Sequence, residues 1–362
     1  MIFRAHLPTP TLLPTMPTEL PYITPELPGI GGEIKMEPAH FIVEEQPLYP
    51  PTGAGDHLFV QLSREGQTTR EMVEHLARAL GIRADGIGYA GLKDKHARVT
   101  QVLSLPEVSP QQAKEAILGL GYGFNWAIPH NRKLRPGHLL GNRFTITILH
   151  PQQPNALGRA TDTVRALEMR GLPNFFGQQR FGKFGDNAEQ GLAILMGKKR
   201  RPRQKWLSKL LISAYQSQLF NDYLTLRMER GWFDKLLPGD LVKKTDTGGM
   251  FFVDDLATDQ ARFERREISF TGPLFGYKMR QPQADAAALE AEIQATSPVT
   301  PQQWRKNRTD GNRRVGRLFL QPVTVQAVSA GIQLSFYLPK GAYATILLRE
   351  VMKPAIALPQ SA

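Results

Sequence analysis

Short runs of apolar and β-branched residues, partly alternating with polar ones, recur through the first half of the chain and return near its end. An apolar side chain at every second position is typical of a strand with one buried face. The pattern predicts strands at residues 41–45, 57–63, 98–105, 143–150 and 331–338.

One helix is predicted clearly between the second and third of these strands, over residues 68–81. Thr68 and Glu71 have the spacing of a capping box, and Gly81 is a residue at which helices commonly end. The apolar periodicity favours one buried face for this helix. That face consists of Met72, Val73, Leu76, Ala79 and Leu80.

Residues 155–171 and 204–231 are also predicted to be helical, and a segment of mixed character, residues 342–352, follows the last strand. Strands and helices do not alternate regularly, so we expect an α+β fold with a mainly antiparallel sheet. No apolar run approaches the roughly 20 residues that a membrane-spanning helix needs. A soluble protein is therefore expected.

Length and composition agree with a folded protein of more than one domain. The chain has 362 residues, of which 41% are hydrophobic and 22% charged. This exceeds the size at which a single core usually stops growing. The absence of cysteine excludes thiolate chemistry and disulfides, which fits the cytoplasm. The proline-rich start, residues 1–30, is expected to be an extended arm.

The charge points to a polyanionic partner. The formal net charge is +12, and such a field attracts nucleic acid. Residues 198–206 and 304–317 each combine a tryptophan with several basic side chains, as in surfaces that bind phosphates and stack on bases. Solvated charged faces that only increase solubility are the alternative. Proline and glycine interrupt both segments, which disfavours a membrane-surface helix.

Residues 88–101, GYAGLKDKHARVTQ, are the most unusual stretch of the chain. Residues 86–91 formally match the dinucleotide-binding pattern G-x-G-x-x-G, but that pattern requires a strand before it and a helix after it. Here the predicted order is the reverse. The eight histidines include no pair with zinc-site spacing, and we expect no metal site.

Asp94 is the candidate for chemistry within this stretch. Between Lys93 and Lys95 it could form no more than a surface ion pair. The glycines before it favour a tight turn that places the carboxylate at the edge of a sheet, where functional side chains concentrate. Neighbouring side chains of an extended segment point to opposite faces. We therefore expect Lys93 and Lys95 to flank the groove opposite Asp94.

The stretch resembles the catalytic motif of the tRNA pseudouridine synthase D (TruD) family, and other segments match the family in the same order. These segments are residues 38–45, 131–146, 173–182, 213–221 and 338–350. The resemblance implies an isomerase that converts uridine to pseudouridine in tRNA, typically at position 13, without a cofactor. It covers the chain from about residue 30 to about residue 353.

The resemblance also assigns the site residues. Asp94 falls on the catalytic aspartate of the family, and Phe41, Asn142 and Tyr343 fall on its substrate-binding set. The two rings would hold an extruded base, and the amide would pair with the uracil edge. A buried carboxylate needs a nearby cation or hydrogen-bond donors to stay ionised. Lys35 is our candidate for that cation.

The resemblance finally implies a catalytic domain interrupted by an inserted α/β TRUD domain. We place the catalytic domain at residues 1–173 and 320–362, and the insertion at 174–319. The insertion then carries the RNA-binding candidates Lys198, Lys199, Arg200 and Arg201. No obligatory protein partner is expected. The competing hypothesis is a basic RNA-binding protein that retains the fold without catalysis.

Overall fold

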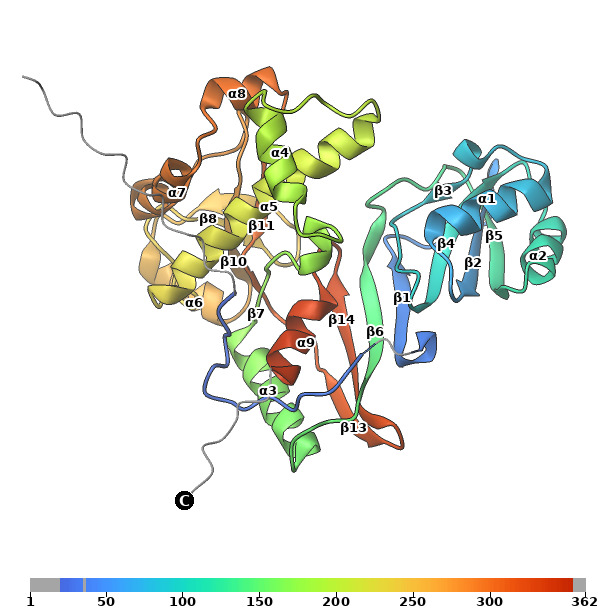
Figure 1. The fold of residues 1–362 in the computed structure, drawn as a ribbon, viewed down its shortest axis with the longest axis horizontal. Coiled ribbons are helices and arrows are strands. Elements are labelled where there is room, and N and C mark those ends of the chain that lie inside the picture. Colours follow the sequence, from blue (N-terminus) through green and yellow to red (C-terminus); the bar gives the residue numbers. More distant parts are fainter. Residues whose placement is uncertain (1–19, 35–36, 354–362) are drawn as a thin grey trace, which may run out of the picture. The chain divides into compact units, whose positions relative to one another are not determined.

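The computed structural model describes residues 20–34 and 37–353, which form two compact units (Figure 1). One unit, called here the sheet unit, consists of residues 23–172 and 319–353 within this range. The other, the inserted unit, consists of residues 20–22 and 173–318. The sequence of the sheet unit is therefore interrupted by that of the inserted unit.

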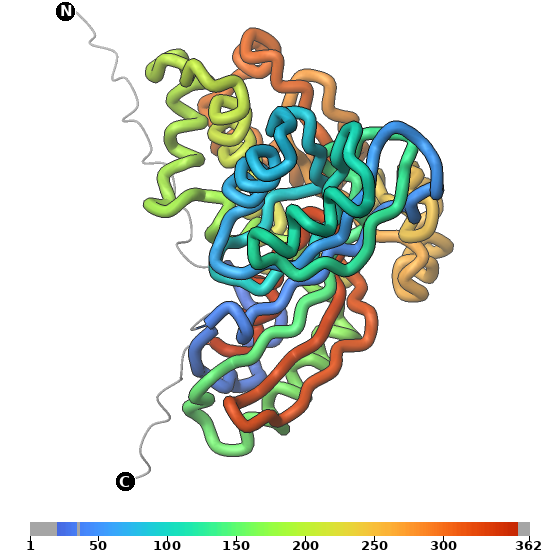
Figure 2. The backbone as a smooth tube through the Cα atoms, turned by 90° about the vertical axis from the view of Figure 1, so that its right-hand side faces the viewer, coloured from blue at the N-terminus to red at the C-terminus, as the bar shows by residue number. Residues whose placement is uncertain are grey.

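The sheet unit is built on an eight-stranded sheet with the order β13-β14-β6-β1-β4-β2-β5, and β3 pairs with β4. The pairing of β1 with β4 is parallel, and the other described pairings of this sheet are antiparallel. The β13–β14 hairpin lies beside β6 (Figure 2). The strands are β1 (Phe41–Pro47), β2 (His57–Arg64), β3 (Gly88–Tyr89), β4 (Arg98–Pro106), β5 (Gly123–His130), β6 (Leu139–Leu149), β13 (Thr324–Val328) and β14 (Gly331–Pro339).

All five predicted strands are confirmed, and together they form the centre of this sheet as β1, β2, β4, β6 and β14. Strand β5 was not predicted; it contains Pro129, and its side chains are mostly half-buried or exposed. It lies at the edge of the sheet, where a proline costs no ladder hydrogen bond. The α+β class with a mainly antiparallel sheet is confirmed.

Four helices of the sheet unit are α1 (Thr69–Leu80), α2 (Pro110–Gly119), α3 (Ala156–Arg170) and α9 (Ala344–Met352). The predicted capping box of α1 is present, and Gly81 ends the helix with a φ of 67°. The buried face contains Ala77 instead of the predicted Ala79, which is exposed. An α-helix rotates by about 100° per residue, so the Ala79 side chain points roughly a quarter turn away from the centre of the buried face.

Helices α1 and α2 cover one face of the β2–β4 part of the sheet. Their apolar residues form one core with those strands, in which Met72, Leu76 and Ile117 pack with Leu62 and Leu103. This core holds the first residues of α1 against the end of β2, where the candidate site begins.

The inserted unit combines five helices with a four-stranded sheet of order β11-β10-β8-β9. The predicted helix at 204–231 is the unbroken α5. Two short strands, β7 (Leu172–Pro173) and β12 (Arg317–Leu318), form a separate two-stranded sheet. The elements of the inserted unit are α4 (Asn187–Leu195), α5 (Lys205–Glu229), β8 (Leu241–Lys244), β9 (Met250–Phe252), α6 (Leu256–Glu264), β10 (Ile268–Leu274), α7 (Ala284–Thr296), α8 (Pro301–Lys306) and β11 (Asn312–Val315).

The described end of the predicted N-terminal arm packs against the sheet unit. Thr24 is buried, and its hydroxyl donates to Glu350 Oε2 at 2.7 Å. Lys353 Nζ donates to Thr24 Oγ1 at 2.9 Å. Ile30 is also fully buried. Thr24 and Ile30 therefore anchor this segment in the core of the unit, although Pro25, Glu26 and Pro28 are exposed. Residues 1–19 lie outside the described range.

Candidate active site

Asp94 lies in the loop of residues 90–97, which connects β3 to β4. The loop is anchored at its start, where the N–H of Gly137 donates to the carbonyl of Ala90 at 2.7 Å. Within the loop, the backbone N–H of His96 donates to Asp94 Oδ1 at 3.0 Å. This local bond is typical of aspartate in turns, and it orients the half-buried carboxylate.

The glycines of this stretch serve close packing of the backbone. A Cβ at Gly88 would lie 2.3 Å from the carbonyl oxygen of Leu134 and 2.4 Å from Ser104 Oγ. Gly88 belongs to β3, and the segment continues into β4, not into a helix. The context that a dinucleotide-binding loop requires is therefore missing, as the sequence indicated.

Lys93 anchors the Asp94 loop to β1 and α1. Its ammonium group forms an ion pair with Glu45, and the two side chains are only 7% and 1% exposed. Its backbone N–H donates to Thr69 Oγ1, in the first turn of α1, at 2.9 Å. Removing one partner of such a buried pair typically costs about 3–5 kcal/mol. The expectation that Lys93 flanks the groove was wrong, because its side chain is buried in this ion pair. Lys95, the other lysine expected there, is exposed.

Arg64, the last residue of β2, supplies a buried positive charge beside the same loop. It is 3% exposed, and its two terminal nitrogens lie 3.5 Å from the carbonyl oxygens of Asp94 and Lys93. Desolvation lowers the pKa of Arg64, while the charges of Tyr122, Glu71 and Asp94 raise it. This attraction is mutual, so Arg64 contributes positive potential at the Asp94 carboxylate.

Asn142 stands beside the Lys93–Glu45 pair. It is the cross-strand partner of Glu45 on β1 and of Leu338 on β14. Paired residues of neighbouring strands project from the same face of a sheet. The Oδ1 atom of Asn142 is buried and has no hydrogen-bond partner among the residues that the structure describes. An acceptor in that state is suited to a donor on a ligand.

Phe41 begins β1 at the end of the sheet where the Asp94 loop enters. Ile42 pairs with Arg98 in the parallel β1–β4 register, so Phe41 is level with the last residue of the loop. The ring of Phe41 is 5% exposed and meets that of Phe144 edge to face, with centroids 6.3 Å apart. Phe41 therefore contributes a mainly buried apolar wall, not an exposed ring face.

Tyr343 occupies the position just before the first residue of α9 and is half-buried. Its carbonyl accepts a bond of 3.1 Å from the N–H of Ile346. The segment that carries Tyr343 follows β14, and Lys340 is held to β6 by a 3.0 Å bond to the carbonyl of Leu140. Lys35, the predicted cation, lies outside the described residues.

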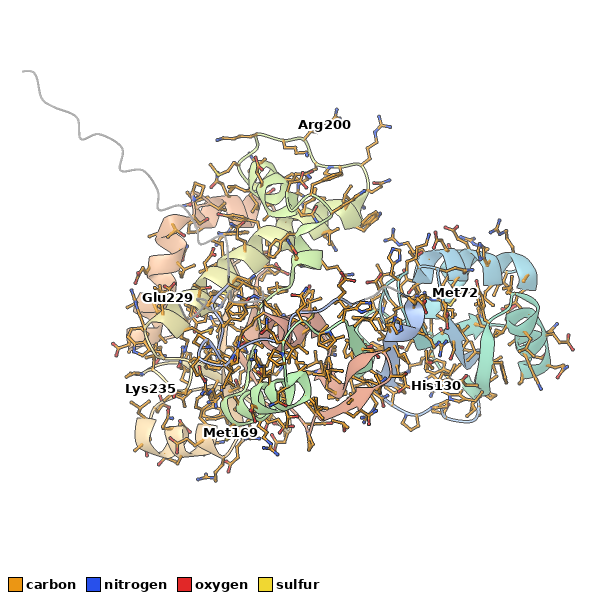
Figure 3. The ribbon with its side chains drawn as sticks, turned by 60° about the horizontal axis from the view of Figure 1, so that its bottom comes forward. Met72, His130, Met169, Arg200, Glu229 and Lys235 are labelled. Atoms are coloured by element: carbon orange, nitrogen blue, oxygen red, sulfur yellow. The ribbon has the colours of Figure 1, made fainter. Side chains whose placement is uncertain are left out.

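In the inserted unit, Lys198, Lys199, Arg200 and Arg201 all lie on the exposed segment between α4 and α5. Figure 3 shows the Arg200 side chain extending from this segment. Arg201 donates to Asn307 Oδ1 at 2.7 Å and so joins the second basic cluster of the sequence. The two clusters are therefore neighbours in the fold, although Arg201 and Asn307 are 106 positions apart in the sequence.

The two tryptophans of these clusters differ. Trp206 is 49% exposed, whereas Trp304 is 3% exposed and stacks on Tyr215 with ring centroids 6.3 Å apart. The predicted stacking surface at Trp304 is therefore wrong for most of that ring, because the ring packs in the core of the inserted unit.

Sequence reasoning missed Arg64 and Glu45 near Asp94, and it did not predict the buried ion pair of Lys93. Arg64 and the Lys93 pair carried no local signal, because their partners lie far away in the sequence. Glu45 had one: it continues the alternation of Phe41 and Val43, which predicts a carboxylate on the buried face of β1. A buried carboxylate implies a buried cation nearby.

Comparison with a solved structure identifies the fold. The crystal structure of a protein assigned to TruD from Methanosarcina mazei matches this chain with a TM-score of 0.75. The match covers 92% of this chain and 96% of that one at 21% identity. The two proteins therefore share the same α+β fold.

Sequence comparison identifies the family. The family model described as tRNA pseudouridine synthase D (TruD) matches residues 18–202 and 201–351. A tRNA pseudouridine synthase D of Anaeromyxobacter dehalogenans is 42% identical over 342 residues, which cover 92% of this chain and 97% of the relative. That of Thermus thermophilus is 44% identical over 330 residues, 90% of each chain. This chain belongs to the TruD family.

Proposed function

We propose that this chain isomerises uridine to pseudouridine at position 13 of tRNA, with Asp94 as the group that acts on the ribose and with no cofactor. Conversion of uridine to pseudouridine in tRNA is the reaction of the family to which the chain belongs. The observation that supports the role of Asp94 most directly is its setting, a half-buried carboxylate oriented by His96 beside the buried guanidinium of Arg64.

The reaction exchanges one bond for another. The N1–C1′ bond breaks, the base turns, the C5–C1′ bond forms, C5 loses a proton and N1 gains one. Asp94 either attacks C1′ as the glycosidic bond breaks or removes the proton from C2′. Uridine deuterated at C2′ separates the two, because only proton removal breaks that bond and produces a primary isotope effect.

The base is bound by three residues in this proposal. A uridine within folded tRNA must leave its stack before a carboxylate can reach its sugar. Tyr343 provides the stacking face, and Phe41, supported by Phe144, provides an apolar wall. The buried Oδ1 of Asn142 accepts from the uracil N3–H, and its amide donates to a uracil carbonyl. Lys35, the predicted cation for Asp94, lies outside the described residues and stays a prediction.

The two parts of the chain have different roles in this proposal. The sheet unit, our catalytic domain, performs the isomerisation. The inserted unit, our TRUD domain, binds the body of the tRNA through Lys198, Lys199, Arg200 and Arg201, which are exposed together on one segment. No helix within the described ranges is long and apolar enough to cross a membrane. We place the protein in the cytoplasm, without an obligatory protein partner.

The proposed reaction and position are tested together on two tRNA transcripts that differ only at position 13. Wild-type protein should form pseudouridine in the transcript with uridine there, and none in the transcript with cytidine. Binding of both transcripts without product in either would favour the non-catalytic alternative. Pseudouridine at another position in both would contradict the assigned position while retaining the reaction.

A further inference from the structure

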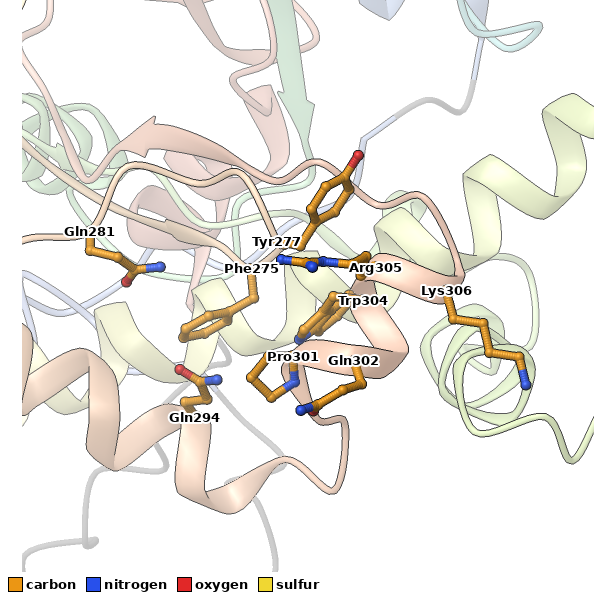
Figure 4. Close-up of a pocket in the computed structure, with 10 residues that line it drawn as sticks. Phe275, Tyr277, Gln281, Gln294, Pro301, Gln302, Trp304, Arg305 and Lys306 are labelled. Atoms are coloured by element: carbon orange, nitrogen blue, oxygen red, sulfur yellow. The ribbon is translucent and has the colours of Figure 1, made fainter.

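The inserted unit contains a pocket that the proposed reaction does not use. It has a volume of about 530 Å³ and is formed by the loop after β10, the helix α7 and the short helix α8 (Figure 4). Its lining consists of Phe275, Gly276, Tyr277, Gln281, Gln294, Pro301, Gln302, Trp304, Arg305 and Lys306.

The lining has three kinds of group. Phe275 and Trp304 are buried and form an apolar aromatic floor. The amides of Gln281 and Gln294 flank the ring of Phe275 in Figure 4, and each amide offers both a donor and an acceptor. The guanidinium carbon of Arg305 lies 5.8 Å from the centroid of the Tyr277 ring.

The charge and the types of side chain that line the pocket indicate the class of ligand that it binds. The ten lining residues include no aspartate or glutamate, and Arg305 and Lys306 are exposed cations at the rim. Asp310, which lies close by, is neutralised by Lys278 at 3.3 Å. Aromatic rings bind flat bases, amides pair with base edges, and cations bind phosphates. An acidic peptide would pair with the two cations, but it would leave the aromatic floor and the amides of Gln281 and Gln294 without matching partners.

The pocket also lies next to the basic segment between α4 and α5. Asn307 directly follows Lys306 and accepts from Arg201 at 2.7 Å. The amide of Asn307 in turn donates to the carbonyl of Leu195, at the end of α4, at 3.2 Å. An RNA strand that follows Lys198–Arg201 would therefore arrive at the rim of the pocket, at Lys306.

We propose that this pocket binds one unstacked nucleotide of the tRNA, with its base between the amides of Gln281 and Gln294 at the exposed edge of the aromatic floor and its phosphate at Arg305. Lys306, which extends away from Arg305 in Figure 4, binds the phosphate of the neighbouring nucleotide. The inference rests on the proposed function only in taking tRNA as the substrate. The pocket is a second point of RNA recognition that contributes to affinity and takes no part in the bond exchange.

The test compares full-length variants for tRNA binding at several salt concentrations and for single-turnover isomerisation at saturating tRNA. Gln294→Leu keeps the approximate side-chain size and removes the amide, so the dissociation constant should rise about fivefold, the typical effect of one lost hydrogen bond. The single-turnover rate should not change. Lys306→Ala should reduce the slope of log affinity against log salt by about 0.7–0.9, the effect of one neutralised phosphate.

Lys235→Ala is the matched control, because Lys235 is an exposed lysine of the same unit outside the pocket lining (Figure 3). It should leave affinity and salt slope unchanged. Thermal unfolding verifies that each variant is folded. Wild-type affinity in Gln294→Leu would overturn the proposal, even if Lys306→Ala lowered the salt slope. Pseudouridine is scored separately, so wild-type protein that binds tRNA without forming product would contradict the proposed function and not the pocket.

Discussion

At the scale of single residues, Arg64 is the neighbour of Asp94 that a motif search does not find. Its forked donors contact the carbonyls of Lys93 and Asp94 and also Thr69 Oγ1, at 3.4 Å. Lysine would retain the charge but not the fork. We expect Arg64→Lys to lower the single-turnover rate about ten- to a hundredfold, the effect of a small displacement of reacting groups, with little change in tRNA affinity. An unchanged rate would show that Arg64 does not position Asp94.

Asn142 supports a second prediction at this scale. Asn142→Leu retains a branched side chain of similar length but removes the acceptor and both donors that, in our proposal, face the uracil edge. The single-turnover rate should fall about ten- to a hundredfold, because a buried uracil donor would be left unpaired. Activity measured on the transcript with uridine at position 13 provides the readout. Equal rates for the variant and the wild type would show that Asn142 does not bind the base.

Single residues also differ in how well the sequence predicted them. Asp94 was predicted from a motif whose order of glycine, lysine and aspartate is distinctive, and its role stays a prediction. The ion pair of Lys93 with Glu45 was not found, because its members are 48 positions apart and meet only through the β1–β4 register. Contacts of this kind depend on strand pairing, which a local pattern does not specify.

At the scale of elements, helix α5 contains an aspartate with an unusual titration. Burial raises the pKa of Asp222 to about 7, and its Oδ2 has no hydrogen-bond partner among the described residues. The unfolded chain loses this proton near pH 4, so the free energy of unfolding decreases between about pH 4 and pH 7. Asp222→Asn should therefore be more stable than wild type by roughly 2–4 kcal/mol at pH 8 and equal to it at pH 4.

Denaturant unfolding at the two pH values measures this difference. Asp254→Asn is the control, because Asp254 is an exposed carboxylate of the same unit. A stability gain for Asp222→Asn that is the same at pH 4 and pH 8 would contradict the titration.

Elements of the sheet unit were easier to predict than those of the inserted unit. The strands β1, β2, β4, β6 and β14 have buried, β-branched faces, and α1 has both of its caps. In the inserted unit, α7 has buried positions but also alanines on most of its surface, so its periodicity is weak. The short strands β8, β9 and β11 are three or four residues long, too short for an alternation to be recognised.

At the scale of the whole molecule, our proposal assigns the chemistry and much of the tRNA binding to different units of the chain. A protein with net charge +12 binds RNA partly by release of counterions. Replacing Lys198, Lys199 and Arg200 by alanine should weaken tRNA binding and reduce the slope of log affinity against log salt by about 0.7–0.9 for each phosphate that is no longer neutralised. Fluorescence anisotropy at several salt concentrations measures the slope. An unchanged slope would contradict the role of this segment.

The carboxylate of Asp94 is central to the proposed reaction. Asp94→Asn preserves the size and the acceptor for the His96 N–H but removes the charge. Single-turnover pseudouridine formation at saturating tRNA should fall by a factor of at least about 10⁴, as on removal of a group that acts directly on the substrate. The tRNA affinity should be retained, and the exposed control Asp85→Asn should behave as wild type. Pseudouridine formation by Asp94→Asn at the wild-type rate would contradict the role of Asp94.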